Sequence, residues 1–178
     1  MNQKINNLLV AASGTGGHIF PALAFAESLP KSWQIEWLGV PHRLENELVP
    51  GKYNLIILKV GGLQGNIFRK IFEFLKLVLA SMRVSILLRQ KKIDVIFTTG
   101  GYISAPGILG AKIAGVPILL HESNAIPGKV TRVLGKFCDY VALGIPSASE
   151  YLQRCRTSFT GTPVRKEFLL EKSLPSWV

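Results

Sequence analysis

The sequence has 178 residues, 48% of them hydrophobic, and a formal net charge of +10. Its length allows one domain, or one domain and the start of another, and its apolar content is sufficient for a substantial core and atypical of a disordered chain. The positive charge favours an anionic partner: nucleic acid, an anionic membrane surface or a phosphorylated substrate. The two cysteines have no metal-ligand spacing and are typical of free thiols in a reducing cytosol.

Short apolar runs alternate with longer helical patterns along the whole chain. The runs are rich in Ile, Leu and Val and mostly apolar on both faces, as parallel strands between two helix layers should be. We predict strands at residues 5–12, 35–38, 55–60, 95–98, 118–121 and 140–143. Helices are predicted at residues 21–29, 66–90, 105–114 and 128–137. This alternation predicts an α/β fold with a doubly wound, mostly parallel sheet.

No part of the sequence is predicted to cross a membrane. The apolar run at residues 8–12 is too short for the core of a signal peptide and is followed at once by glycines, so it indicates a buried strand. No run reaches the ~18 uninterrupted apolar residues of a membrane-spanning helix. We therefore expect a cytoplasmic protein whose membrane contact is peripheral.

A glycine-rich loop, Ser-Gly-Thr-Gly-Gly-His at residues 13–18, follows the first predicted strand. Its glycines permit tight turns, and free amides at the start of the next helix favour an anion. A dinucleotide site would need an acidic residue at the end of the second strand, where residues 37–39 supply none, and no P-loop Gly-Lys-Ser/Thr follows. A dinucleotide oxidoreductase is therefore disfavoured.

His18 closes this loop at the edge of the sheet where ligands bind. Its chemistry suits a general base for a sugar hydroxyl, and the competing interpretation is a structural or helix-capping histidine. His42 is expected to be solvated, and His121, beside Glu122, is expected to hold a loop by hydrogen bonds. The histidines are too scattered to predict a metal site.

Two further loops add polar groups to the same edge of the predicted sheet. Residues 98–106 could offer amides, hydroxyls and the aromatic face of Tyr102 to a sugar or a phosphate. Residues 121–124 supply the carboxylate of Glu122 and the amide of Asn124, which together could orient a polyol.

The predicted helix at residues 66–90 is cationic and amphipathic. Its apolar face comprises Ile67, Phe68, Ile71, Phe72, Leu75, Val78, Leu79, Met82 and Ile86. The basic residues beside that face include Arg69, Lys70, Lys76 and Arg83. This combination favours contact with an anionic membrane, although a face buried in the core is the alternative. Nucleic acid is disfavoured because no recognised reader motif is present.

Four ordered motifs, at residues 14–22, 99–106, 121–124 and 161–165, closely resemble the MurG family. These are the UDP-N-acetylglucosamine–N-acetylmuramyl-(pentapeptide) pyrophosphoryl-undecaprenol N-acetylglucosamine transferases. The resemblance implies a GT-B glycosyltransferase with two Rossmann-like halves, of which the N-terminal half receives the lipid-linked acceptor and associates with the membrane. It also implies a location at the cytoplasmic face of the bacterial plasma membrane and a role in peptidoglycan biosynthesis.

The resemblance also implies roles for individual residues. His18 would be the base in a single displacement that inverts the anomeric carbon, and Arg165 would meet the nucleotide diphosphate. The other implied substrate-binding residues are Thr15, Gly16, Gly17, Tyr102, Glu122 and Asn124. No cofactor or metal is implied, and the partners would be UDP-N-acetylglucosamine, the lipid-linked muramyl-pentapeptide and an anionic membrane.

The extent of the chain bears on its activity. By resemblance, residues 1–162 would form the acceptor-binding and membrane-associating domain, and residues 163–178 the linker and the start of a donor-binding domain. We expect this chain to fold but to catalyse little without a C-terminal half, as a piece of a longer protein or one chain of a split enzyme. The alternative function is a non-catalytic membrane adaptor subunit of a split glycosyltransferase.

Overall fold

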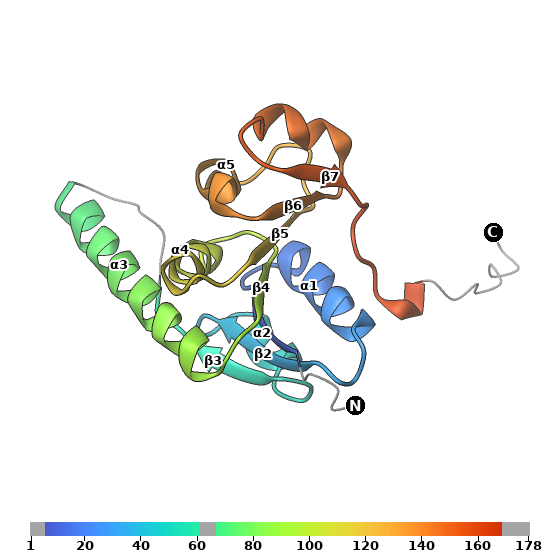
Figure 1. The fold of residues 1–178 in the computed structure, drawn as a ribbon, viewed down its shortest axis with the longest axis horizontal. Coiled ribbons are helices and arrows are strands. Elements are labelled where there is room, and N and C mark those ends of the chain that lie inside the picture. The colour runs from blue at the N-terminus through green and yellow to red at the C-terminus, as the bar shows by residue number, and fades with distance from the viewer. Residues whose placement is uncertain (1–5, 61–66, 169–178) are drawn as a thin grey trace, which may run out of the picture.

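The structure, a computed structural model, describes residues 6–60 and 67–168, with the backbone alone at residues 67–70 (Figure 1). The described strands form one seven-stranded sheet in the order β3-β2-β1-β4-β5-β6-β7, and each neighbouring pair is parallel. The strands are β1 (Asn7–Ala11), β2 (Gln34–Gly39), β3 (Asn54–Ile57), β4 (Val95–Thr98), β5 (Ile118–Glu122), β6 (Tyr140–Leu143) and β7 (Thr157–Phe159). The predicted doubly wound α/β fold is therefore confirmed.

Helices connect these strands. The α-helices are α1 (Gly16–Ser28), α2 (Glu45–Leu48), α3 (Ile67–Gln90), α4 (Ser104–Ala114) and α5 (Lys129–Leu134). The 3₁₀ helices are η1 (Gly135–Phe137), η2 (Pro146–Tyr151) and η3 (Lys166–Phe168). The sequence did not predict α2, η2 or β7, because segments of three to six residues are too short to show a helical or strand period.

Helix α1 begins five residues before the predicted start at Pro21. The carbonyl oxygen of Thr15 accepts the N–H groups of His18 and Ile19 at 3.0 and 3.1 Å, so the last glycines of the loop already form the first helical turn. Pro21 then lies inside the helix, where it offers no N–H to the carbonyl of Gly17. The glycine loop is therefore partly helix, and His18 projects from its first turn.

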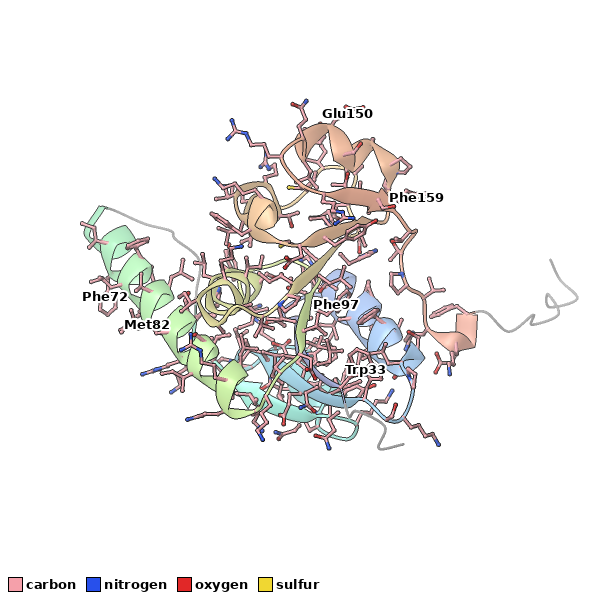
Figure 2. All side chains as sticks on the ribbon, viewed as in Figure 1. Trp33, Phe72, Met82, Phe97, Glu150 and Phe159 are labelled. Atoms are coloured by element: carbon pink, nitrogen blue, oxygen red, sulfur yellow. The ribbon has the colours of Figure 1, made fainter. Side chains whose placement is uncertain are left out.

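The core lies on both faces of the sheet, as the alternation of β1 shows. Leu8 and Val10 pack in the cluster that contains the buried residues of α1, whereas Leu9 and Ala11 pack in the cluster that contains those of α3 and α4. Figure 2 shows Phe97 of β4 among the central side chains, beside α1, where its ring stacks on Phe25 at 3.9 Å between centroids. These two layers hold the carboxyl ends of the strands in fixed positions.

Helices α3 and α4 pack closely because small residues meet at their crossing. A Cβ added at Gly110 would lie 2.7 Å from the Cβ of Val84 and 2.8 Å from the carbonyl oxygen of Ser81. The residues of α3 buried at this contact and beneath it are Ala80, Ser81, Val84, Ser85 and Leu88. The inner face of α3 is thus made largely of small side chains.

The segment after β7 returns across the carboxyl edge of the sheet to α1, as the orange trace in Figure 1 shows. The Gly161 carbonyl oxygen lies 2.9 Å from His121 Nε2, and Thr162 lies against Gly144, where an added Cβ would overlap its hydroxyl. Farther on, the guanidinium of Arg165 lies 4.6 Å from the centre of the Phe20 ring. We call residues 160–165, fixed at these three places, the return segment.

His121 anchors the return segment in its neutral form. Because a carbonyl can only accept, Nε2 carries the proton and donates it to Gly161, while the Ser123 hydroxyl lies 3.3 Å from Nδ1 and can donate to it. Burial is the main cause that lowers the pKa of His121, and the Gly161 bond and the charge of Glu122 oppose it. The expectation that His121 holds a loop by hydrogen bonds is confirmed by these contacts.

Gly110→Ala should lower the stability of the chain by about 1–3 kcal/mol, because the added methyl group overlaps the backbone and side chain of α3. Gly51→Ala is the matched control, since a Cβ at Gly51 meets nothing within 4 Å. Thermal unfolding of the 178-residue chain, followed by circular dichroism, measures both. Equal melting temperatures for the two variants would contradict the close helix contact.

The lowered pKa of His121 predicts acid sensitivity. The unfolded chain binds this proton more readily than the folded chain, so stability should fall as the pH drops from above about 6.5 through the folded-state pKa. His121→Gln keeps an N–H donor for Gly161 without a titrating group, and should flatten this part of the stability curve between about pH 7.5 and pH 5. His42→Asn, at an exposed position with φ 57°, should leave it unchanged. If the stabilities of the wild type and His121→Gln fall in parallel with pH, His121 is not the cause of the acid sensitivity.

Candidate functional site

The candidate site lies where the strand order reverses. Strand β1 pairs with β2 on one side and with β4 on the other, and its two partners lead to connections on opposite faces of the sheet. Ligands of such sheets bind in the crevice at this point, beyond the carboxyl ends of the strands. Here the loops that follow β1 and β4, which contain the predicted motifs at residues 13–18 and 99–101, lie side by side.

His18 joins these two loops. Its Nδ1 lies 2.7 Å from the carbonyl oxygen of Thr99, and the Thr99 hydroxyl donates back to the carbonyl oxygen of His18 at 2.9 Å. Because the Thr99 oxygen can only accept, Nδ1 carries the proton, which in the neutral ring leaves the lone pair on Nε2. The ring therefore has the tautomer that a base acting through Nε2 needs.

Two glycines with positive φ make room for the His18 ring. Gly100 and Gly101 have φ angles of 91° and 80°. A Cβ added at Gly100 would lie 3.4 Å from His18 Cε1, and one added at Gly101 would lie 3.7 Å from Nε2. These positions need glycine for their backbone conformation, and the ring lies close over both.

A buried hydroxyl network fixes the loop after β4 to β1. The Thr98 hydroxyl donates to the carbonyl oxygen of Ala11 at 2.6 Å and also contacts the Ser104 hydroxyl, which donates to the carbonyl oxygen of Gly100 at 2.5 Å. Thr98 and Ser104 have no solvent exposure. The network therefore ties the start of α4, the glycine pair and the end of β1 into one unit.

Glu45 belongs to this region, and sequence reasoning missed it. Its side chain is fully buried, and its two carboxylate oxygens accept the N–H groups of Gly14 at 3.1 Å and Val40 at 2.9 Å. The second strand does end without an acid of its own, but α2 returns this carboxylate to the strand end. Because Glu45 is buried and bonded to Gly14, it holds the glycine loop and offers no exposed carboxylate to a ribose. Its polar surroundings in the sequence gave no sign of burial.

Glu122 has a similar internal role after β5. It is 1% exposed, and its carboxylate accepts the backbone and side-chain N–H groups of Asn124 at 3.1 and 2.7 Å and the N–H of Gly128 at 3.2 Å. These bonds fix the loop before α5, and they leave Asn124 exposed. The described contacts of the Glu122 carboxylate are thus within its own loop, of which Asn124 is an exposed member.

The remaining predicted substrate-binding residues are exposed at this edge or adjoin it. Tyr102 is 55% exposed on the turn that leads into α4, and Thr15 is exposed at the N-terminus of α1. Gly16 lies under the Phe20 ring, and the return segment brings Arg165 over the same ring. The structure therefore brings the region after β7, far away in the sequence, next to the glycine-loop helix.

Both cysteines are free thiols, of which Cys138 is buried and Cys155 partly buried. Burial is the main cause that raises the pKa of the Cys138 thiol to about 12, and it also raises the pKa of Cys155. Thiols with raised pKa values are poor nucleophiles at neutral pH. Among the described residues, no three His, Cys, Asp or Glu side chains form a group that could hold a metal ion.

Helix α3 carries a second candidate surface, made of large apolar side chains. Seven large apolar side chains there are each 51–58% exposed: Ile71, Phe72, Phe74, Leu75, Leu79, Met82 and Ile86. We call these residues the outer face of α3, and Figure 2 shows Phe72 and Met82 on the side of the helix turned away from the sheet. The alternative that the apolar face is buried in the core is therefore wrong for the six of these residues that the sequence analysis placed on that face, whereas Val78 is partly buried. The predicted contacts Ile67, Phe68, Arg69 and Lys70 have side chains outside the described residues.

Basic groups accompany the outer face of α3. Lys76 lies 4.4 Å from the centre of the Phe72 ring and bonds Glu73 at 2.9 Å, so part of its charge is balanced locally. Arg83 lines a groove of about 320 Å³ between α3 and the end of β3, together with Ile86 and Ile57. Within residues 6–60 and 67–168, none of the helices has the length and apolarity that crossing a bilayer requires.

Comparison with known proteins shows the family to which this fold belongs. Residues 8–143 match the glycosyltransferase family 28 N-terminal domain. A relative from Prochlorococcus marinus strain NATL2A is 82% identical over 171 residues, which are 96% of this chain and 49% of the relative. One from Synechococcus sp. strain CC9311 is 56% identical over 96% of this chain and 48% of its own length. Both are named UDP-N-acetylglucosamine–N-acetylmuramyl-(pentapeptide) pyrophosphoryl-undecaprenol N-acetylglucosamine transferase. The chain thus spans about half the length of the curated relatives it matches.

Solved structures agree with this placement. The crystal structure of Acinetobacter baumannii MurG is similar over 80% of this chain and 42% of that one, with a TM-score of 0.71 and 33% identity. A UDP-N-acetylglucosamine 2-epimerase from Rickettsia bellii shares the fold alone, with a TM-score of 0.64 and 15% identity over 89% of this chain and 45% of that one. The resemblance to the MurG family is confirmed, and the chain belongs to glycosyltransferase family 28, whose N-terminal domain it contains.

Proposed function

We propose that this chain is the acceptor-binding half of the inverting transferase that moves N-acetylglucosamine from UDP-N-acetylglucosamine to undecaprenyl-pyrophosphoryl-N-acetylmuramyl-pentapeptide. The observation that carries the proposal is the position of His18: in a family 28 N-terminal domain, at the carboxyl edge of the sheet, with its Nδ1 bonded to Thr99. In this proposal residues 1–162 form the acceptor domain, residues 163–178 lead to a donor-binding half, and the complete enzyme is needed for turnover.

His18 would act as the base of a single displacement. Its Nε2 would take the proton of the acceptor hydroxyl as that oxygen attacks the anomeric carbon of N-acetylglucosamine, and the bond from this carbon to UDP would break on the opposite face. The configuration of the anomeric carbon is then inverted, and UDP leaves as an anion. The Thr99 carbonyl supports this chemistry because it holds the Nδ1 proton and favours the positive charge that the ring acquires.

The other site residues would bind the two substrates. The first-turn amides of α1, at Gly16 and Gly17, have no partner within the helix and could hold an oxygen of a phosphate or sugar, beside the Thr15 hydroxyl. Tyr102 and Asn124 would contact the acceptor sugar, while Glu122 would hold the Asn124 loop in place. Arg165 would reach the leaving diphosphate from the return segment, as a cation that stabilises the developing charge.

The outer face of α3 would rest on the cytoplasmic surface of the plasma membrane. Water hydrates its seven exposed apolar side chains poorly, and Lys76 and Arg83 lie near them. An apolar surface with cations nearby suits a bilayer with anionic headgroups. Peripheral contact of this kind would bring the site to the membrane that contains a lipid-linked acceptor.

A transfer assay tests both the proposed function and the assignment of His18 as the base. We would join this chain to the C-terminal half of the 82% identical Prochlorococcus marinus relative, and measure transfer of radiolabelled N-acetylglucosamine to lipid-linked muramyl-pentapeptide. The fused chain should be active and the 178-residue chain should not. His18→Ala should lower kcat by at least about a hundredfold, since general-base catalysis contributes roughly 10²–10⁴-fold.

His42→Asn is the matched histidine control for this assay and should retain full activity, because His42 is exposed and outside the site. Undiminished transfer by His18→Ala would remove His18 from the chemistry. An inactive wild-type fused chain, with both halves folded, would instead favour the non-catalytic membrane adaptor.

Sedimentation with lipid vesicles tests the membrane surface. The chain should bind vesicles that contain phosphatidylglycerol more tightly than pure phosphatidylcholine vesicles, and added salt should weaken the difference. Leu75→Ser with Leu79→Ser should reduce partitioning more than about tenfold, because each buried leucine contributes about 1.5–3 kcal/mol.

Phe159→Ser is the matched control for vesicle binding, since Phe159 is 61% exposed on the edge strand β7, well away from α3 in Figure 2. This variant should bind vesicles like the wild type. If Phe159→Ser loses as much vesicle binding as the double leucine variant, the outer face of α3 is not the membrane surface.

A further inference from the structure

Thr131 has a buried hydroxyl group that no hydrogen bond in the described structure uses. The residue is 1% exposed, and its Oγ1 is one of two buried side-chain oxygen or nitrogen atoms without a partner among the described residues. A buried polar group without a partner costs free energy, and in native proteins such groups are rare and often mark functional sites. The hydroxyl of a helical threonine can bond a carbonyl of the preceding turn, which this one does not.

The position of this hydroxyl links it to His18. A Cβ added at Gly100 would lie 3.6 Å from Thr131 Oγ1, 3.4 Å from His18 Cε1 and 3.7 Å from His18 Nδ1. The threonine oxygen and one edge of the imidazole ring therefore border the same point above Gly100. A larger residue at position 100 would contact both groups, and the φ of 91° already disfavours one there.

The surrounding structure holds Thr131 in place. Glu122 accepts the N–H of Gly128, and the Gly128 carbonyl oxygen accepts the N–H of Arg132 at 3.0 Å, so the first turn of α5 is fixed to the end of β5. His18 is fixed independently through Thr99. Thr131 and His18 thus come from separate elements, and each is positioned by bonds that do not involve the other.

We propose that Thr131 is a positioning residue that acts through His18. When His18 has taken the proton of the acceptor hydroxyl, its ring carries a full positive charge, and the Thr131 oxygen, with unused lone pairs, borders the same point above Gly100 as that ring. A hydroxyl dipole that can turn its oxygen towards a charge appearing during the reaction lowers the barrier, because it interacts more strongly with the transition state than with the ground state. This inference rests on the proposed function.

Thr131→Val tests the inference in the fused chain, since valine keeps the shape and removes the hydroxyl. We expect kcat to fall about tenfold, with the KM values for both substrates changed less than about twofold. Thr131→Ser restores the hydroxyl and should recover most of kcat. The melting temperature of Thr131→Val should stay the same or rise, because the variant no longer buries an unpartnered hydroxyl.

A double-mutant cycle tests whether Thr131 acts through His18. In a His18→Ala background, Thr131→Val should cause no further loss, because the charged ring that it stabilises is absent. Thr157→Val, on β7, is the remote threonine control and should leave kcat unchanged. If Thr131→Val lowers kcat further in the His18→Ala background, the inference is overturned.

The other outcomes also decide the inference. Full activity of Thr131→Val, in a fused chain whose wild type is active, refutes the role of Thr131 and leaves the proposed function standing. The valine and serine variants could both show a lowered melting temperature, a lower kcat and a higher KM. That result would show that Thr131 only packs the helix. A folded wild-type fused chain without transfer refutes the proposed function, and this inference with it.

Discussion

The parallel pairing of β1 with β4 is the constraint on which the site depends. Ala11 and Thr98 are partners in this register, and the Thr98 hydroxyl bonds the carbonyl oxygen of Ala11 at the last paired position. Two loops separated by more than eighty residues must therefore leave the sheet next to each other. Because one loop turns directly into α1, His18 meets the backbone of the other loop within the first helical turn. A shift in this pairing would separate the histidine from Thr99 even if every other element kept its fold.

Helix α3 reverses the usual relation between apolar pattern and burial. In most helices of globular proteins the strongest apolar face points into the core. In α3 the small residues Ala80, Ser81 and Ser85 are buried at or near the contact with α4, while large apolar residues such as Leu79 and Ile86 remain exposed. Close packing at Gly110 makes this arrangement possible, because shape complementarity replaces bulky side chains at the contact. The fold does not need the outer face of α3, which agrees with a use outside the core.

The sequence was sufficient to predict the fold class, six of the strands and the region of the site, because these follow from local apolar runs and from glycines at strand ends. It could not separate the buried from the exposed side of α3, since that depends on how closely α4 approaches. Glu45 and Thr131 were missed for a related reason. Glu45 is buried where it bonds Gly14 and Val40, and Thr131 is buried near Gly100, and no local period reveals these neighbours. His121 was predicted to hold a loop, but its partner Gly161 lies forty residues away.

The return segment has a consequence for motion between two halves. A hinge needs residues whose backbone angles are free to change. Residues 160–165 are held by His121, by the close contact at Gly144 and by the stacking of Arg165 on Phe20, so they move with the sheet. In a two-domain protein built on this chain, relative motion of the two halves would pivot beyond Arg165. Arg165 would then move with the sheet of this half, as a fixed part of its carboxyl edge.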